Sequence, residues 1–133
     1  MNTEKEKLSL LSDLIALAKA DNEIREAEYE LILAVANQLG VDKATLDKLF
    51  DTKAERVPLK LESQRILQFH RLVLLMNVDG ENHINEMETI HNIGLKMGLN
   101  PMAIDQVLKV MYEYPNRVVP PEVLVGIFKA HYN

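Results

Sequence analysis

The chain has 133 residues, 47% of them hydrophobic, and a formal net charge of −5 from 15 Lys and Arg against 20 Asp and Glu. This length is typical of one domain with its own buried core, and the hydrophobic content excludes a disordered acidic tail. An acidic balance lacks the basic surface that binds a phosphate backbone, so we expect no nucleic acid partner.

Apolar residues at three- and four-residue spacing predict three helices in the first half of the chain. Thr3 and Glu6 predict a capping box at the start of the first helix. The second helix is expected to end at Gly40, because glycine best adopts the left-handed conformation that closes a helix. Asp42 is expected to cap the third helix. The expected bounds are about 4–20, 26–39 and 43–50.

Helical patterns return after residues 51–60, a polar segment with a proline that we interpret as a linker within one domain. The next helix is apolar on more than one side, as expected of a helix buried in the centre. Asn85 with Glu88 predicts a capping box for the following helix, and Asn100 with Pro101 predicts the start of another. The expected bounds are about 61–77, 86–97, 101–111 and 121–131, and no strand is predicted.

The two halves of the chain resemble each other when one is shifted by 58 residues. This self-similarity predicts two helical hairpins that pack face to face. An alternative register pairs Ile24 with Ile84 and Arg25 with Asn85, and the sequence leaves both registers open. The aligned pairs are Leu14 and Leu72, Asp21 and Asp79, Glu23 and Glu81, Glu28 and Glu86, Leu39 and Met97, Gly40 and Gly98, and Asp47 and Asp105.

These patterns together predict an all-α fold, a bundle of about seven helices in a single domain. The bundle is expected to consist of two pseudo-repeated helical hairpins and a C-terminal helix. The expected parts are repeat 1 at about 8–50, the linker at 51–60, repeat 2 at about 61–111, and the C-terminal helix at about 121–131.

The compartment is predicted from cysteine content and from the absence of export and membrane signals. The chain has no cysteine, which excludes disulfides and thiolate metal sites. Its first residues, "MNTEKEK", lack the pattern of a secretory signal. The longest apolar run, "LVLLM" at 72–76, is far shorter than the ~20 residues of a membrane helix. We therefore expect a cytoplasmic protein without a transmembrane segment.

Acidic residues gather at the two helix junctions, near Glu28 in the first half and near Glu88 in the second. Calcium, magnesium and manganese bind clustered carboxylates, so each junction is a candidate cation site. A twelve-residue calcium loop would end at Ile32 or Ile90 where it needs Glu, which excludes an EF-hand. The alternative is that the acids stabilise helix starts, by ~0.3–1 kcal/mol each. The candidate ligands are Asp21, Glu23, Glu26, Asp79, Glu81 and Glu86.

Catalytic motifs are absent from the sequence. Glu88 and His91 have the spacing of one di-iron motif, but such a site needs a second copy, which the chain lacks. There is also no phosphate-binding loop and no nucleophile elbow. We therefore predict a protein that is not an enzyme.

The segment "YEYPNRVVPP", 112–121, is a candidate surface for a protein partner. Tyr112, Tyr114 and Arg117 combine aromatic and cationic side chains, which are enriched in binding surfaces. The alternative is that the tyrosines cover the core at the end of a helix.

The segment "LIALAKADNEIREAEYELILAVANQLGVD", 14–42, resembles the TerB-like domain of tellurite-resistance proteins. That family has a helix running into Asp-Gly-Glu-Ile/Val, an acidic helix start, and a Leu-Gly-Leu end. The segment "VDGENHINEMETIHNIGLKMGL", 78–99, looks like a second copy in which Asn82 and His83 interrupt the junction. The two copies cover about 14–111.

The TerB-like resemblance implies an all-helical bundle that acts in metal-linked stress responses through acidic residues, without catalysis. The first hypothesis is therefore a cytosolic accessory protein of the tellurite-resistance type, which binds a divalent cation at the junctions. The alternative is a small helical protein-interaction module in which the acids are structural caps and no metal binds.

Overall fold

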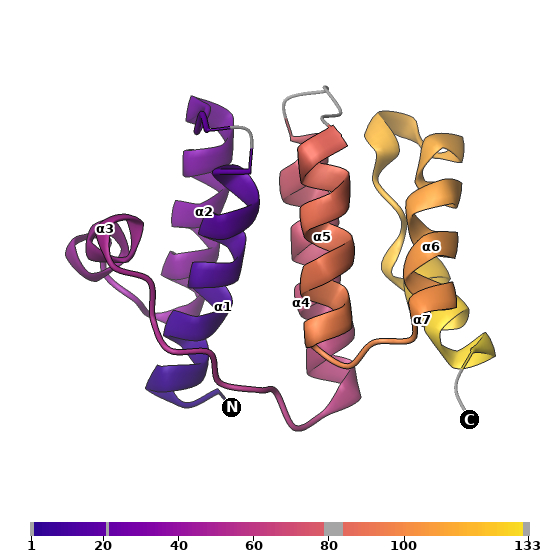
Figure 1. The fold of residues 1–133 in the computed structure, drawn as a ribbon, viewed down its shortest axis with the longest axis horizontal. Coiled ribbons are helices and arrows are strands. Elements are labelled where there is room, and N and C mark those ends of the chain that lie inside the picture. The colour runs from indigo at the N-terminus through magenta and orange to yellow at the C-terminus, as the bar shows by residue number, and fades with distance from the viewer. Residues whose placement is uncertain (1, 21, 79–83, 132–133) are drawn as a thin grey trace.

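The computed structural model describes residues 2–20, 22–78 and 84–131, and this part of the chain forms seven α-helices and no strand (Figure 1). Two short 3-10 turns, η1 and η2, precede the last helix. No helix in this part is long and apolar enough to cross a membrane. The elements are α1 (Glu4–Ala18), α2 (Glu26–Leu39), α3 (Lys43–Asp51), α4 (Glu62–Asn77), α5 (Ile84–Lys96), α6 (Pro101–Val110), η1 (Met111–Glu113), η2 (Pro115–Arg117) and α7 (Pro121–Ala130).

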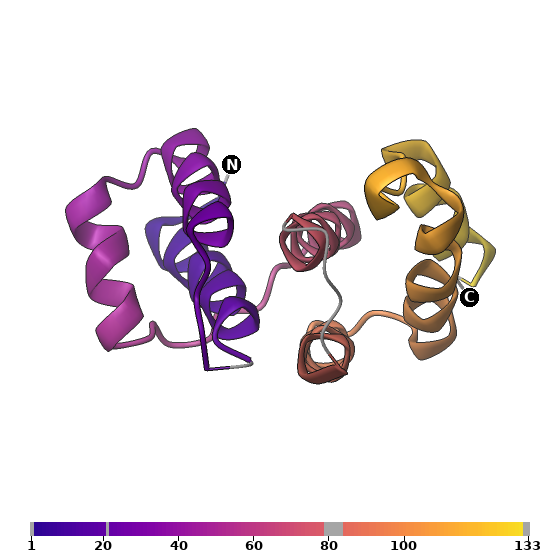
Figure 2. The same cartoon turned by 90° about the horizontal axis from the view of Figure 1, so that it is seen from above.

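The helices lie in roughly two layers (Figures 1 and 2). One layer contains α1, α5 and α6, and the other contains α2, α4 and α7. The short helix α3 packs against α1 and α2 at one end of the bundle. Helix α4 therefore lies in the middle of its layer, with α2 on one side and α7 on the other.

The expected helix caps are confirmed at three helix starts. The amide of Thr3 donates to the Glu6 carboxylate at 2.8 Å, and the amide of Glu6 donates to the Thr3 hydroxyl at 3.1 Å. The carboxylate of Asp42 accepts from the amide of Thr45 at 2.8 Å. Asn100 accepts from the first amides of α6. Each side chain occupies a donor that the helix itself leaves unbonded, so local chemistry fixes where these helices begin.

One of the sequence predictions about helices is wrong. Asn85 does not cap α5, because α5 begins one residue earlier, at Ile84, and Asn85 lies within its first turn. Helix α4 is central, as predicted, because it packs against α1, α2, α5 and α7, but Leu67 on its outward face is 49% exposed and Leu74 is half-buried. Its outward face is open to solvent despite its apolar side chains.

The helices of the two halves begin at matching places. The first residues of α1, α2 and α3 each lie 58 residues before those of α4, α5 and α6. Gly40 and Gly98, also 58 residues apart, have φ of 77° and 81° and lie just after α2 and α5. This left-handed conformation strains residues with a Cβ, which explains why glycine occupies both positions.

The core is continuous and centres on the contact between α1 and α4. The C-terminal helix joins it through Phe128, whose ring meets that of Phe69 edge-on at a centroid distance of 5.8 Å. The fully buried large side chains are Phe69, Phe128, Leu11, Leu14, Leu17, Ile32, Leu46, Leu72, Leu75, Met76, Ile90 and Ile104.

Gly94 and Gly126 allow a matched test of packing in α5 and α7. A Cβ at Gly94 would lie 2.7 Å from Ile104 Cδ1 and 3.2 Å from Phe69 Cε1, and both neighbours are fully buried. We expect Gly94→Ala to lower the free energy of unfolding by about 1–3 kcal/mol through overpacking. Denaturant unfolding measures this change.

Gly126→Ala is the control, because a Cβ there meets nothing within 4 Å. Alanine has a higher helix propensity than glycine, so we expect a gain of up to about 1 kcal/mol. Equal effects of the two substitutions would contradict the close packing of α5 against α6.

Candidate functional site

The predicted junction ligands lie in different environments. Glu23 and Glu26 are exposed next to the start of α2, whereas Glu86 is only 1% exposed in the first turn of α5. Asp21, Asp79 and Glu81 lie outside the described residues. Within residues 2–20, 22–78 and 84–131, no group of three or more His, Asp or Glu side chains is close enough to hold one metal ion.

Glu28 is the counterpart of Glu86 in the first half, 58 residues earlier, and is only 2% exposed. One of its carboxylate oxygens accepts from the backbone amide of Arg25 at 2.9 Å. This contact satisfies a donor at the start of α2, which is the structural role that the sequence offered as the alternative to metal binding.

The predicted partner residues differ in exposure, because Tyr112 is exposed whereas Tyr114 and Arg117 are partly buried. Tyr112 is 54% exposed, and the Arg117 guanidinium carbon lies 5.4 Å from the centroid of its ring. This distance lies within the range in which a guanidinium is attracted to the face of an aromatic ring. Tyr114 is partly buried against the core. The alternative prediction, that tyrosines cover the core, therefore applies to Tyr114 and not to Tyr112.

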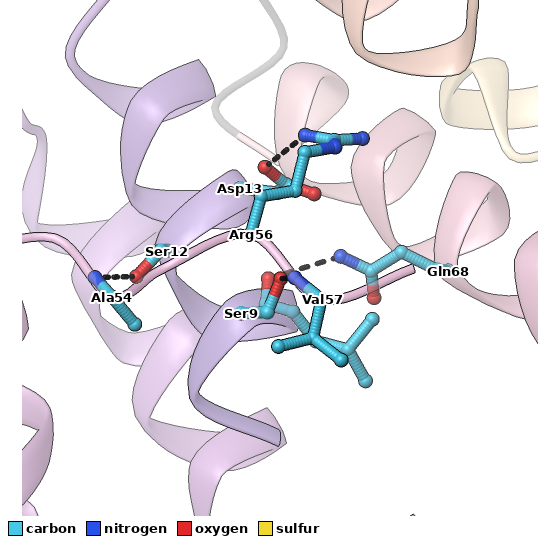
Figure 3. Close-up of polar contacts among 8 residues, drawn as sticks. Ser9, Ser12, Asp13, Ala54, Arg56, Val57 and Gln68 are labelled. Atoms are coloured by element: carbon cyan, nitrogen blue, oxygen red, sulfur yellow. Dashed lines mark hydrogen bonds and ion pairs between the residues drawn. The ribbon is translucent and has the colours of Figure 1, made fainter. Parts of the chain in front are cut away.

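A polar groove of about 500 Å³ lies between α1, the linker and α5, and the sequence did not predict it. Figure 3 shows how the linker is held across α1. The amides of Ala54 and Val57 donate to the hydroxyls of Ser12 at 2.9 Å and Ser9 at 3.0 Å. An extended segment has no internal hydrogen bonds, so these two serines supply the acceptors that it needs. The groove is lined by Ser9, Ser12, Asp13, Ala16, Lys53, Ala54, Glu55, Arg56, Thr89, Asn92, Ile93 and Lys96.

An ion pair closes this polar groove. Arg56 of the linker lies 3.2 Å from the carboxylate of Asp13 on α1 (Figure 3). Burial raises the pKa of Asp13 above its ordinary value of 3.8, although Arg56 opposes the shift. The net shift upward means that the loss of water around the carboxylate outweighs the attraction of the guanidinium.

A second polar connection joins α4 to α1 and orients Arg71. The side-chain amide of Gln68, which is fully buried, donates to the Leu10 carbonyl at 3.0 Å. The oxygen of the same side chain accepts from Arg71 Nη1 at 3.3 Å. The guanidinium of Arg71 is therefore held at one edge by a side chain that is itself fixed to α1.

Arg71 borders a small apolar hollow of about 20 Å³ between α1, α2 and α4, which is also lined by the fully buried Leu14, Ile32 and Leu75. Leu31 and Val35 of α2 and Leu74 of α4 line this hollow with it. The exposed Leu67 lies one turn before Arg71 on α4. We call the surface formed by Leu31, Val35, Leu67, Arg71 and Leu74 the α2–α4 groove.

A further hollow, of about 350 Å³, lies on the other side of α4 against α7. Its apolar lining comes from Ile66, Val125 and Phe128, and Val125 is 36% exposed. Leu67 lines neither hollow, but its neighbours on α4 do, since Ile66 lines the hollow toward α7 and Arg71, one turn later, lines the hollow toward α2.

The chain matches no protein-family model, and no curated protein or solved structure matches it. The TerB-like resemblance of residues 14–42 and 78–99 therefore stays a prediction. The assignment of function consequently rests on the surfaces described above.

Sequence reasoning missed Arg71, Asp13 and the two serines of the polar groove. Asp13 contacts Arg56 across 43 residues, and Gln68 contacts Leu10 across 58 residues. Periodicity within one helix carries no information about such contacts. One available signal was the 58-residue offset, which aligns Asp13 with Arg71 on the two central helices.

Asp13 provides a test of the polar groove through pH. Because the pKa of its carboxyl is raised in the folded state, the folded protein binds more protons than the unfolded protein just above pH 3.8. The contribution of Asp13 to stability therefore falls as the pH rises through this interval. We expect Asp13→Asn to gain stability relative to wild type from about pH 3.5 to about pH 7, measured by urea unfolding.

Asp42→Asn is the control of opposite sign. The hydrogen bond from the Thr45 amide lowers the pKa of Asp42, so its contribution to stability is present above the ordinary pKa and is lost on acidification. This variant should lose stability relative to wild type as the pH rises, and asparagine still caps the helix. Shifts of the same sign in both variants would contradict the environment described for Asp13.

Proposed function

We propose that this chain is a helical protein-interaction module that acts by binding and not by catalysis. The observation that carries this proposal is the exposed apolar face of α4. Leu67 in the middle of this face is 49% exposed, and apolar hollows lie beside it toward α2 and α7. Contiguous apolar surfaces of this kind are typical of binding sites in folded proteins.

The face suits a partner because covering it is energetically favourable. Full burial of a leucine or valine side chain contributes roughly 1.5–3 kcal/mol. Leu67 is 49% exposed and Val125 is 36% exposed, so both side chains would gain from a cover. Arg71 at the edge of the groove adds a directional contact, which apolar side chains alone lack.

We propose further that the two halves are pseudo-repeated helical hairpins related by an offset of 58 residues. The helix starts, the two left-handed glycines, and the buried Glu28 and Glu86 support this offset. The alternative register with two extra residues is disfavoured by the start of α5 at Ile84, because α2 starts at Glu26.

We keep as a second candidate the cation-binding accessory protein of the tellurite-resistance type. The arrangement of the helices favours it, because α1 ends and α2 begins at the same end of the bundle where α4 ends and α5 begins (Figure 1). Exposed carboxylates of Glu23 and Glu26 lie near that end. Acids from both junctions could then contribute oxygens to a calcium, magnesium or manganese ion.

A pull-down with two surface variants tests the interaction module. We expect wild-type protein to capture a partner from a lysate of the source cells, and Leu67→Asp to lose it by at least about tenfold because a charge is placed in the apolar face. Tyr112→Ala serves as the matched variant on the other candidate surface. Loss of the partner with Tyr112→Ala alone would move the site to Tyr112 and Arg117, and capture of nothing would contradict the module.

Calorimetric titration of metal-free protein tests the second candidate. If the junctions bind a cation, titration of wild type with calcium, magnesium or manganese should give a heat of binding. Titration of an Asp21→Asn/Asp79→Asn variant should give no such heat. Asparagine has nearly the size of aspartate but removes two negative charges. Silence of wild type toward all three ions would leave the acids with a structural role.

A further inference from the structure

The α2–α4 groove has a counterpart in the first half of the molecule. All five of its positions lie 58 residues from positions that line the polar groove between α1 and α5. Two leucines of the α2–α4 groove correspond to a serine and a threonine, and Leu74 corresponds to the smaller Ala16. The pairs are Ser9 and Leu67, Asp13 and Arg71, Ala16 and Leu74, Leu31 and Thr89, and Val35 and Ile93.

In the first half, the chain covers this position itself. The linker crosses α1, donates amides to Ser9 and Ser12, and places Arg56 against Asp13 (Figure 3). Leu67 is the counterpart of Ser9 on α4, and it is 49% exposed. No segment of the described residues therefore covers the α2–α4 groove in this way, although its side chains are more apolar than those of the polar groove.

Arg71 indicates what kind of group the open groove lacks. It occupies on α4 the position that Asp13 occupies on α1, so the charge at the two positions is reversed. Its guanidinium is half-buried and bonds to Gln68, and no carboxylate of the described residues pairs with it. Burial lowers the pKa of Arg71, and no opposite charge among the described residues compensates its guanidinium. A carboxylate supplied from outside would compensate it.

We infer that the α2–α4 groove binds an amphipathic helix of a partner protein, which places a carboxylate against Arg71. This inference rests on the proposed function and names the chemistry of the partner. The stretch from Leu67 to Leu74 is about 10 Å long, which corresponds to two turns of a bound helix. A helix is the fitting occupant because its backbone is satisfied internally, whereas this groove has no serine where the polar groove binds its extended segment through Ser9 and Ser12.

A second copy of this chain is a poor occupant of the same groove. A twofold contact presents the same surface on both sides, and that surface contributes Arg71 but no carboxylate. Face-to-face packing would therefore bring two guanidinium groups together. The charge favours a different protein with Asp or Glu on the apolar face of its helix.

Two synthetic peptides provide the test. Each is an amphipathic helix of about 14 residues with leucines at three- and four-residue spacing, and they differ only in one Glu or Gln within the leucine face. Titration into the full-length, ¹⁵N-labelled protein should shift amides of α2 and α4. The Glu peptide should bind about tenfold more tightly than the Gln peptide, because a charge-assisted hydrogen bond forms with Arg71.

Three variants locate the effect. Arg71→Gln should remove the preference for the Glu peptide, and Leu67→Asp should weaken both peptides. Leu95→Asp is the matched control, because Leu95 is 40% exposed on α5 and lies outside the groove. It should bind both peptides as wild type does.

Equal binding of the two peptides to wild type would overturn the inference without the need for any variant. So would shifts confined to other helices, the absence of binding, or self-association that Arg71→Gln abolishes. Capture of a cellular partner that depends on Leu67 but not on Arg71 would overturn the role of the carboxylate and leave the interaction module standing. Capture that is lost with Arg71→Gln and with Leu67→Asp but kept with Leu95→Asp would support both the interaction module and the role of the carboxylate.

Discussion

The packing of α1 against α4 is the contact on which the remaining structure depends. Gln68 is fully buried in this contact and donates to the carbonyl of Leu10. A buried amide without a partner is costly, so a shift of α4 along α1 would be penalised at this one point. The apolar side chains around it supply most of the attraction but little register, because leucines slide past each other easily. The same Gln68 side chain orients Arg71. The register of the central helices and the geometry of the open groove therefore have a common origin.

Much of the secondary structure could be predicted from the sequence because its signals are local. Thr3 with Glu6, Asp42 and Gly40 act within one helical turn, and the structure contains each of them in its expected role. The prediction failed at Asn85, because a capping pattern of two residues also occurs inside helices. The central position of α4 was predicted, but the exposure of Leu67 was not, because periodicity shows which faces of a helix are apolar and not which of them a neighbouring helix covers.

The candidate site was harder to predict because it depends on contacts between distant residues. The junction acids and Tyr112 attract notice as clusters in sequence, whereas Asp13, Arg56 and Arg71 are single charged residues within ordinary helical or linker patterns. Their roles follow only when α5 is placed beside α1 and α2 beside α4. Glu28 differs from these residues, because it belongs to an acidic cluster that is conspicuous in the sequence, and yet it makes a local hydrogen bond to the amide of Arg25.

The two grooves show how positions 58 residues apart in the two halves of the chain serve different uses. Both lie between the first helix of one hairpin and the second helix of the other. Serine hydroxyls in the first groove accept the amides of an extended segment, so the linker covers it and Arg56 compensates the charge of Asp13. Leucine and valine in the second groove offer an extended backbone no acceptors, so covering it with such a segment would leave amides unsatisfied. The apolar side chains of the second groove therefore disfavour the linker type of cover, and Arg71, at the position that corresponds to Asp13, favours an acidic helix in its place.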